Sequence, residues 1–489
     1  MPRPRLIAIL TLLLAPLAWA TEPDTAGMDA SELERAGLRA FAEGRYDDAE
    51  AYLNAQAEAA PESFEPWYNL AVVACAREDA DLAVTCLQRA IILGFTDFRA
   101  LSDDPDIACV RSSDFYQQTV TRWQEVLDAR RAADLTVARR LVPSKWEERT
   151  IEPLKLEVIS AHDSVSTDQC REEIEIIAAW AHTHLFPDLI APGAVLDDPW
   201  VSIILPDRAE FARWAIAVFG PGARSGLSSI GGAYDHNRRR LVAQDLGATL
   251  RHELIHVLHW RDMSRLGQQH APWIQEGLAS LVEDYDLEDG WLVPVPSWRT
   301  NIVKRLNDSD RLTPIDRLAA TPMDRFVMSR PLAQYAQSRA VMLFLLDRGK
   351  LSEFYRAYTE SFDDDPTGLA ALRRTLAMEQ GELEKAYREW LDTLPMVAET
   401  GTDLPATLGI EIENGTGDGV RVTGLPPGSR ERTGLRIGSF ITAINGRPTR
   451  DLSELIRVLS DYLPGESVTL SHRRGRVHAT SEVELLPRK

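Results

Sequence analysis

The stretch that decides the central fold is ATLRHELIHVLHW, residues 248–260. His252 and His256 lie four positions apart, which places both imidazoles on one face of a helix, one turn from each other. Glu253 stands beside them, where it can take a proton from a bound water. Apolar residues on the other positions predict that this helix is amphipathic and partly buried; they are Leu250, Leu254, Ile255 and Leu258. The pattern predicts a metal-binding helix from about residue 247 to 259.

His259 continues the same stripe, seven residues after His252. Three successive histidines on one helix can hardly converge on one ion at about 2 Å, given a rise of about 1.5 Å per residue. We therefore interpret His259 as a supporting or substrate-facing residue. We expect His270 to lie in a loop.

A second stretch follows nineteen residues after His256: Trp273-Ile-Gln-Glu276-Gly-Leu-Ala-Ser280. It resembles the WLxEGxAS segment of gluzincin metallopeptidases, including the membrane-alanyl-aminopeptidase relatives. The resemblance implies that Glu276 is the third ligand of one Zn²⁺ per chain, with His252 and His256, and that water takes the fourth position. A metzincin site does not fit, because the position six residues past His256 is Asp262 rather than histidine.

The same resemblance implies a hydrolytic mechanism with Glu253 as general base. Tyr335, 59 positions past Glu276, is the candidate donor to the oxyanion, although it also suits an ordinary half-buried helical tyrosine. Gly232-Ala233-Tyr234 precedes the metal helix and is the candidate edge strand for pairing with an extended substrate, or a plain sheet edge.

Two departures separate the chain from the aminopeptidases of this family. The GxMEN-type segment that grips a free N-terminus is not visible, and the spacing from His256 to Glu276 is one residue longer. Both departures favour an endopeptidase over an exopeptidase.

The surrounding pattern predicts an α+β domain over residues 150–396, with strands first and helices afterwards. Short β-rich runs and a helix come before the metal helix, and the pattern is largely helical from there to Met396. The expected early elements are strands at 154–159 and 200–205, a helix at 167–185, and a strand or hairpin edge at 230–242.

Residues 30–98 contain an internal repeat of 34 residues, in which small and medium apolar residues recur. The matching pairs are Gly37 and Ala71, Ala49 and Ala83, and Leu53 and Leu87. The segment resembles tetratricopeptide repeats, with capping helices that complete an α-helical region at residues 30–140. Such a region either packs on the next domain or offers a groove for a peptide.

Residues 397–406 read as a linker, and residues 404–489 resemble a PDZ domain of the bacterial periplasmic-protease kind. Matching pieces are Pro427-Gly428-Ser429, Thr433-Gly434-Leu435, Ile444-Asn445-Gly446 and Pro464-Gly465. The resemblance implies a small β-rich domain in which the amides of Leu408-Gly409-Ile410 hold a peptide C-terminus. A purely structural role is the alternative.

Residues 1–20 read as a cleavable signal peptide: Arg3 and Arg5 precede an apolar run, and Ala18-Trp19-Ala20 offers a cleavage pattern. No later stretch is apolar enough to span a membrane. We therefore expect a periplasmic or secreted protein. The formal net charge of −20 disfavours nucleic acid and anionic membrane surfaces as partners, and we expect Arg238-Arg239-Arg240 to form a solvated strand end.

The four cysteines do not form a CxxC pair, so they give no support to cysteine-based zinc or redox chemistry; they are Cys75, Cys86, Cys109 and Cys170. Cys75 and Cys86 fall on neighbouring predicted helices, where they either pair or remain buried thiols.

Two hypotheses of function follow for this multidomain chain. In the first, it is an exported zinc peptidase whose tetratricopeptide and PDZ regions select protein or peptide substrates. In the second, it is a catalytically inactive, peptidase-like scaffold for protein–protein interactions in the periplasm. The presence of His252, Glu253, His256 and Glu276 together favours the first.

Overall fold

The computed structural model divides the chain into two compact units, Met1–Val126 and Leu127–Lys489. It describes residues 25–142, 145–190, 200–219, 231–235 and 239–488. The expected signal peptide at residues 1–20 lies outside these ranges. No helix in the described part is both long and apolar enough to cross a membrane.

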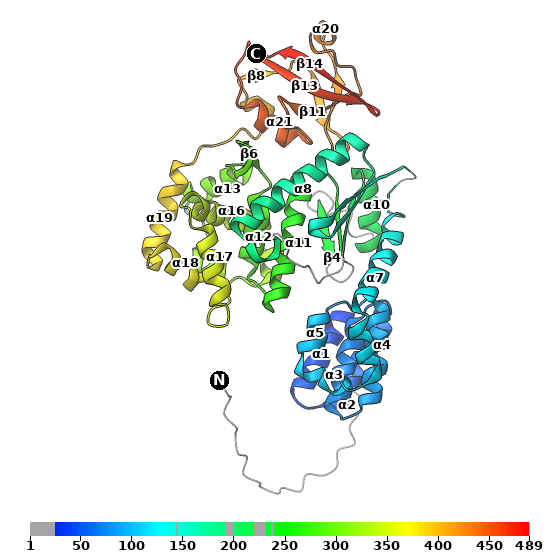
Figure 1. The fold of residues 1–489 in the computed structure, drawn as a ribbon. Helices are drawn as coiled ribbons and strands as arrows, with labels where there is room; N and C mark the ends of the chain where they lie inside the picture. Colours follow the sequence, from blue (N-terminus) through cyan, green and yellow to red (C-terminus); the bar gives the residue numbers. More distant parts are fainter. Residues whose placement is uncertain (1–24, 143–144, 191–199, 220–230, 236–238, 489) are drawn as a thin grey trace. The chain divides into compact units, whose positions relative to one another are not determined.

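The first unit is helical (Figure 1). Its helices are α1 (Ala30–Ala42), α2 (Tyr46–Ala59), α3 (Glu65–Ala76), α4 (Ala80–Leu93), α5 (Phe98–Asp103), the 3₁₀ helix η1 (Pro105–Val110), α6 (Asp114–Thr121) and the start of α7 (Trp123–Ala138). Small residues of the 34-residue repeat are buried where consecutive helices pack: a Cβ on Gly37 would lie 3.0 Å from Leu53.

One disulfide joins helices of this unit. Cys75 at the end of α3 is bonded to Cys109 in η1, whereas Cys86 is a buried free thiol. The proposed pairing of Cys75 with Cys86 is therefore wrong. The two sulfurs are brought together by the packing of η1 against α3, which the spacing of cysteines along the chain does not reveal.

The second unit begins with a five-stranded sheet in the order β1-β2-β3-β5-β4. Its strands are β1 (Glu147–Ile151), β2 (Leu156–Ser160), β3 (Val201–Leu205), β4 (Gly232–Asp235) and β5 (Arg240–Ala243). The three central strands are parallel to one another, and β1 and β4 are antiparallel edges. The central strands are almost wholly buried, as their near-continuous apolar sequences predict.

Helices cover both faces of this sheet. Alternate residues of the central strands pack on α8 (Ser164–His184) and α11 (Ala248–Leu266) on one face. The residues between them, including Ile204 and Val242, pack on the end of α7 and on α10 (Arg208–Phe219) on the other. The short helices α9 (Pro187–Ile190) and η2 (Glu152–Leu154) complete this part.

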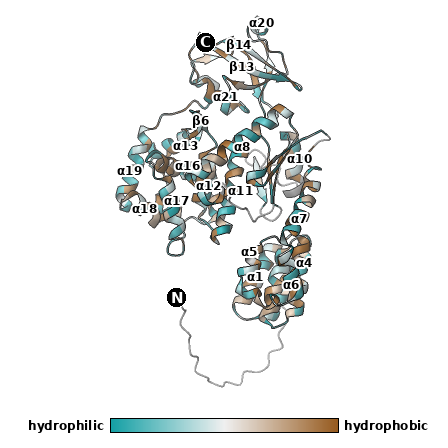
Figure 2. Ribbon diagram, in the orientation of Figure 1, coloured by the Kyte–Doolittle hydropathy of each residue, from teal (hydrophilic) through white to brown (hydrophobic). Residues whose placement is uncertain are grey.

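The remaining helices form a large apolar core with α11. They are α12 (Pro272–Leu281), α13 (Trp298–Asp308), α14 (Ile315–Ala319), α15 (Met323–Met328), α16 (Pro331–Asp347), α17 (Leu351–Glu360), α18 (Leu369–Leu376) and α19 (Gln380–Thr393). Apolar residues, brown in Figure 2, concentrate on the central helices of this group, among them α12 and α16.

A hairpin interrupts the helical run that the sequence analysis predicts after residue 259. Strands β6 (Tyr285–Glu288) and β7 (Trp291–Pro294) pair antiparallel around Asp289-Gly290. Both turn residues have positive φ, 52° and 84°. Asp-Gly is a strong signal for such a two-residue turn, so the local sequence did contain a signal for this hairpin.

The C-terminal part is a small β-rich domain. A six-stranded sheet contains β9 (Glu411–Asn414), β10 (Val420–Gly424), β11 (Phe440–Ile444), β12 (Arg447–Pro448), β13 (Ser467–Arg474) and β14 (Val477–Glu484). A second, small sheet pairs β8 (Ala406–Thr407) with β15 (Leu486–Pro487), and the helices are η4 (Gly401–Asp403), α20 (Ser429–Thr433) and α21 (Leu452–Leu459). The preceding linker is fastened to α13, where Asn301 donates to the carbonyl of Val397 at 2.9 Å.

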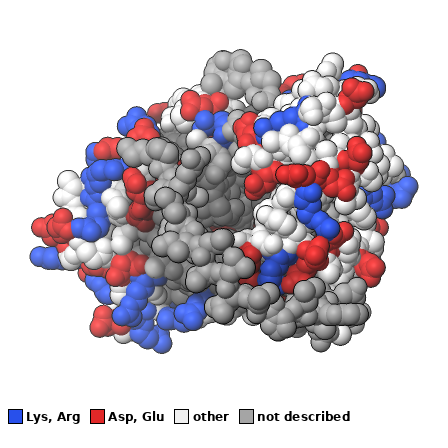
Figure 3. Space-filling model, turned by 90° about the horizontal axis from the view of Figure 1, so that it is seen from below, with Lys and Arg blue, Asp and Glu red and all other residues white. Residues whose placement is uncertain are grey.

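The basic run at the start of β5 is not the solvated strand end that we expect from its charge. Arg239 and Arg240 are buried, and the Arg239 guanidinium lies 3.8 Å from the ring centroid of Trp260. Arg238 lies outside the described residues. On the face shown in Figure 3, basic and acidic side chains are intermixed over the described surface.

Candidate metal centre

Helix α11 presents two histidines on its less buried face. Leu254 and Leu258 are fully buried in the core, which leaves His252, Glu253 and His256 partly exposed. The helix begins after Gly247 and ends at Gly267, which adopts the left-handed conformation that glycine favours. It therefore extends seven residues beyond the predicted end at 259.

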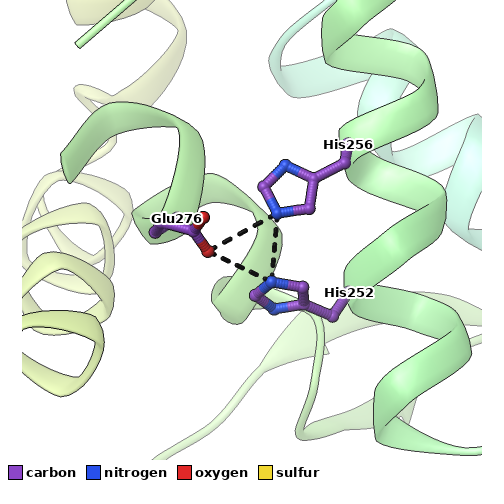
Figure 4. Close-up of side chains that lie close together, drawn as sticks. All are labelled: His252, His256 and Glu276. Carbon is purple, nitrogen blue, oxygen red and sulfur yellow. Dashed lines mark hydrogen bonds and ion pairs between the residues drawn. The ribbon is translucent and has the colours of Figure 1, made fainter. Parts of the chain in front are cut away.

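Helix α12 brings Glu276 to the same point (Figure 4). The Oε2 atom of Glu276 lies 3.2 Å from His252 Nε2 and 3.5 Å from His256 Nε2, and the two nitrogens are 3.1 Å apart. Three ligands held at 2.0–2.1 Å around a tetrahedral zinc ion would be roughly 3.3 Å apart. These are the residues among the described ones that converge as a metal-binding group, and their donor set and spacing fit zinc.

Glycine after Glu276 allows α12 to approach α16 closely. A Cβ on Gly277 would lie 2.8 Å from the carbonyl oxygen of Ser338 and 2.9 Å from the Met342 side chain. Burial by itself would raise the pKa of Glu276, but the two histidines outweigh it and hold that pKa well below its usual range. Glu276 is therefore a charged carboxylate, as a ligand must be.

The first histidine is oriented by a second carboxylate. Glu283 Oε1 lies 2.8 Å from His252 Nδ1, and the Arg299 guanidinium on α13 donates to Glu283 at 2.5 and 2.8 Å. Burial by itself would raise the pKa of Glu283, but Arg299 and His252 hold it at about 2. With Nδ1 donating to this carboxylate, Nε2 is the atom left to bind a metal.

The two carboxylates together favour positive charge at this position. Burial by itself would lower the pKa of His252, but its bonds to Glu276 and Glu283 raise it to about 10. That is the electrostatic condition for binding a cation. The local sequence pattern did not assign Glu283 or Arg299 to the site; the available signal was a carboxylate seven residues past Glu276.

The edge strand β4 packs directly against the catalytic candidate Glu253. A Cβ on Gly232 would lie 2.8 Å from Glu253 Cγ and 2.8 Å from Thr249 Cγ2. The strand that contains Gly232, Ala233 and Tyr234 is thus an edge of the sheet beside the metal helix. Burial raises the pKa of Glu253, which brings this carboxylate closer to the range in which a general base works.

Tyr335 on α16 lies beside the same cluster. Its ring stacks 6.2 Å from that of His252, and the Arg299 guanidinium is 5.8 Å from its ring centroid. Burial, the charge of Glu276 and a hydrogen bond with Glu276 hold the pKa of Tyr335 above its usual value. The hydroxyl is therefore protonated at neutral pH and can donate.

The other histidines of this region, His259 and His270, contact each other. His259 is fully buried, with its Nε2 2.7 Å from His270 Nδ1 and its ring stacked on Phe186. It belongs to the core, so a substrate-facing position is excluded. His270 lies in the loop between α11 and α12, as we expect from the sequence, and is buried there.

The candidate peptide-binding residues, Leu408, Gly409 and Ile410, lie in the C-terminal domain just before β9. Gly409 has a φ of 62°, its amide donates to Thr407 Oγ1 at 3.1 Å, and its carbonyl accepts from Ser429 at 3.1 Å. The carbonyl of Leu408 accepts from Arg432, and Ile410 is partly buried against the domain core. One of the three amides that the sequence suggests for a peptide carboxylate is thus already hydrogen-bonded.

Comparisons with known proteins give little guidance. No family model matches the chain, and no curated protein matches it. Among solved structures, it is similar to an aminopeptidase N family protein from Idiomarina loihiensis, with 12% sequence identity and a TM-score of 0.28. That alignment covers 71% of this chain and 67% of the other.

Proposed function

We propose that this chain is an exported zinc-dependent endopeptidase that cleaves protein or peptide substrates in the cell envelope. The observation that carries the proposal is the convergence of His252, His256 and Glu276, whose ligand atoms lie 3.1–3.5 Å from one another. Glu253 lies on α11, between the two histidines. Zinc bound there would polarise a scissile carbonyl and lower the pKa of a water molecule.

The residues around the cluster suit the proton transfers of peptide hydrolysis. Glu253 accepts the proton of the attacking water and passes it to the leaving amine. Tyr335 donates a hydrogen bond to the carbonyl oxygen, which becomes an oxyanion when water adds to the carbonyl carbon. Glu283 and Arg299 keep His252 in the orientation that binding requires.

In this proposal, the regions on either side of the peptidase domain select the substrate. The helical repeats and the C-terminal domain are expected to bind unfolded segments or peptide C-termini and to deliver them to the cluster. The strand Gly232–Asp235 offers an edge along which an extended chain can pair.

Zinc content and proteolysis test the proposal together. We expect elemental analysis to find about one zinc per wild-type chain and almost none in His256→Ala, because two ligands hold the ion poorly. Casein digestion should stop in Glu253→Gln, which keeps the ligands but removes the base. His472→Ala, on β13, is the matched control and should retain both zinc and activity.

Three outcomes are informative. Zinc with cleavage that depends on Glu253 would support a working peptidase. Zinc without cleavage of any tested protein would favour the inactive scaffold. A folded, metal-supplied wild-type protein that binds no zinc would exclude the metallopeptidase proposal.

A further inference from the structure

Four buried charged side chains join the C-terminal domain to the helices around His252, His256 and Glu276. Glu173 lies on α8, Arg251 on α11, Arg450 just before α21, and Glu454 on α21; each is only 3–5% exposed. We call these four residues the junction network. Two positive and two negative charges alternate in it, so the network is neutral as a whole.

Each charge in the junction network has partners of the opposite sign. Arg251 reaches Glu173 at 3.0 Å and Glu454 at 2.6 Å. Arg450 lies 2.6 Å from Glu173, and its backbone amide donates to Glu454 at 2.8 Å. Tyr285 also donates to Glu173, at 2.7 Å.

Arg251 connects the junction network to His252, one of the three proposed zinc ligands. This residue precedes His252 on α11, and its Nε and Nη2 atoms donate to the backbone carbonyl of Glu283 at 3.1 and 2.5 Å. The Glu283 carboxylate in turn holds His252 Nδ1 at 2.8 Å. The same Nη2 atom of Arg251 that holds Glu283 also donates to Glu454.

Charge burial makes Arg251 sensitive to the loss of Glu454. A buried guanidinium that loses one of its two carboxylates must find another acceptor or admit water, and either change moves it. Apolar residues could join two domains at least as firmly as a buried ion network. What the network adds is directed hydrogen bonding, because Arg251 donates to the carbonyl of Glu283 in a fixed geometry.

We propose that Glu454, a residue of the C-terminal domain, is a positioning residue of the metal centre. It holds Arg251, which holds Glu283 and through it the ring of His252. The inference rests on the proposed function, because it takes His252, His256 and Glu276 as zinc ligands. It makes the zinc affinity of the cluster depend on where α21 sits, so the C-terminal domain regulates the site that it adjoins.

Zinc affinity is the decisive measurement, because a purely structural contact would not change it. The metal-free, full-length protein is titrated with zinc in competition with a chromophoric chelator. Residues that orient a metal ligand indirectly typically change affinity by about 10–100-fold, and we expect Glu454→Gln to weaken zinc binding about tenfold. Should that variant fail to fold, Glu454→Asp keeps the charge but shortens the side chain, and we expect it to weaken binding severalfold.

Arg447→Gln is the matched control. Arg447 also lies in the C-terminal domain, but its ion-pair partners are Asp286 of β6, at 2.7 Å, and Asp461, and not residues of the junction network. It should lower the thermal midpoint of the metal-free protein and leave zinc affinity within twofold of wild type.

The outcomes separate this inference from the proposed function. Wild-type affinity in folded Glu454→Gln, or an equal loss in Arg447→Gln, would overturn the positioning role and leave the peptidase proposal standing. A wild-type protein that binds no zinc would overturn the proposed function, and this inference with it.

Discussion

Tyr335 is the residue whose catalytic role the structure makes most directly testable. Its ring lies against that of His252, yet it is not one of the three converging ligands. If it stabilises the oxyanion, Tyr335→Phe should lower kcat by about 10²–10³-fold. Zinc content, measured in parallel, should stay at the wild-type value; unchanged kcat would remove Tyr335 from the mechanism.

Gly232 tests whether the edge strand positions the general base. Any Cβ there would overlap Glu253 Cγ at 2.8 Å, so Gly232→Ala must push the glutamate or the strand aside. A displacement of about 1 Å at a reacting group can cost about 100-fold in rate, and we expect a loss of that order in kcat. The proposed zinc ligands are untouched, so zinc content should not change. Full activity would show that Glu253 does not depend on this contact.

At the scale of single residues, local spacing predicts the three metal-ligand candidates but not what supports them. Two histidines four apart share a helix face whatever else the chain does. Glu283, Arg299 and Arg251 act across elements that are far apart in sequence, and nothing in the local pattern assigns them to His252. Likewise, the buried position of His259 follows from Phe186 and His270 beside it.

The packing of α12 on α16 positions Glu276, and at Gly277 the two helices approach each other closely. Because the clash at 2.8 Å is with the Ser338 backbone, Gly277→Ala must force the helices apart. We expect it to reduce the free energy of unfolding by about 1–3 kcal/mol, measured by urea denaturation of the metal-free protein. Gly381→Ala on α19, where a Cβ meets nothing within 4 Å, is the control and should be neutral or slightly stabilising. Equal stability of the two variants would contradict the close packing.

Elements were predicted best where their periodicity was strong. The central strands and the helices α8 and α11 lie near the ranges expected from their apolar patterns. The helices α16, α17 and α19 lie within the stretch that was predicted to be largely helical. The β6–β7 hairpin was missed because a general helical trend was extended over a clear Asp-Gly turn signal.

Asp418 connects the two parts of the second unit and should make the stability of this unit depend on pH. Burial by itself would raise the pKa of Asp418, but hydrogen bonds from Arg473 at 2.6 Å hold it at about 2, and Ser166 of α8 donates to it at 3.2 Å. Since the folded pKa is below the ordinary value, the charged form stabilises the fold above pH 4, and this contribution disappears as the pH falls towards 2.

Asp418→Asn should therefore reduce stability at pH 7 by about 2 kcal/mol, from a shift of about two pKa units. The difference between variant and wild type should shrink as the pH falls from 4 to 2. Thermal unfolding followed across that pH range measures it. A difference that stays constant with pH would show that the carboxylate charge is not what Arg473 and Ser166 stabilise.

The division into two units predicts two steps of thermal unfolding. The proposed zinc ligands all lie in the unit of residues 127–489, so zinc should raise the transition temperature of that unit alone. At a free zinc concentration of 100 times Kd, binding adds about 2.7 kcal/mol to the stability of that unit. Calorimetry with zinc and with EDTA distinguishes the steps, and an equal shift of both transitions would contradict independent units.

The sequence by itself determined the features that depend on neighbours along the chain. These are the helix with His252, Glu253 and His256, the position of Glu276 shortly after it, and the apolar strands and helices that surround them. Their determinants are spacing and side-chain polarity, which act over a few helical turns.

Only the tertiary structure decided which residues far apart in the sequence contact one another. It placed Glu283 on His252, Gly232 against Glu253, Cys109 on Cys75 and Glu454 on Arg251. Each of these contacts joins separate elements, so its existence depends on how helices and strands pack rather than on any periodicity in the sequence.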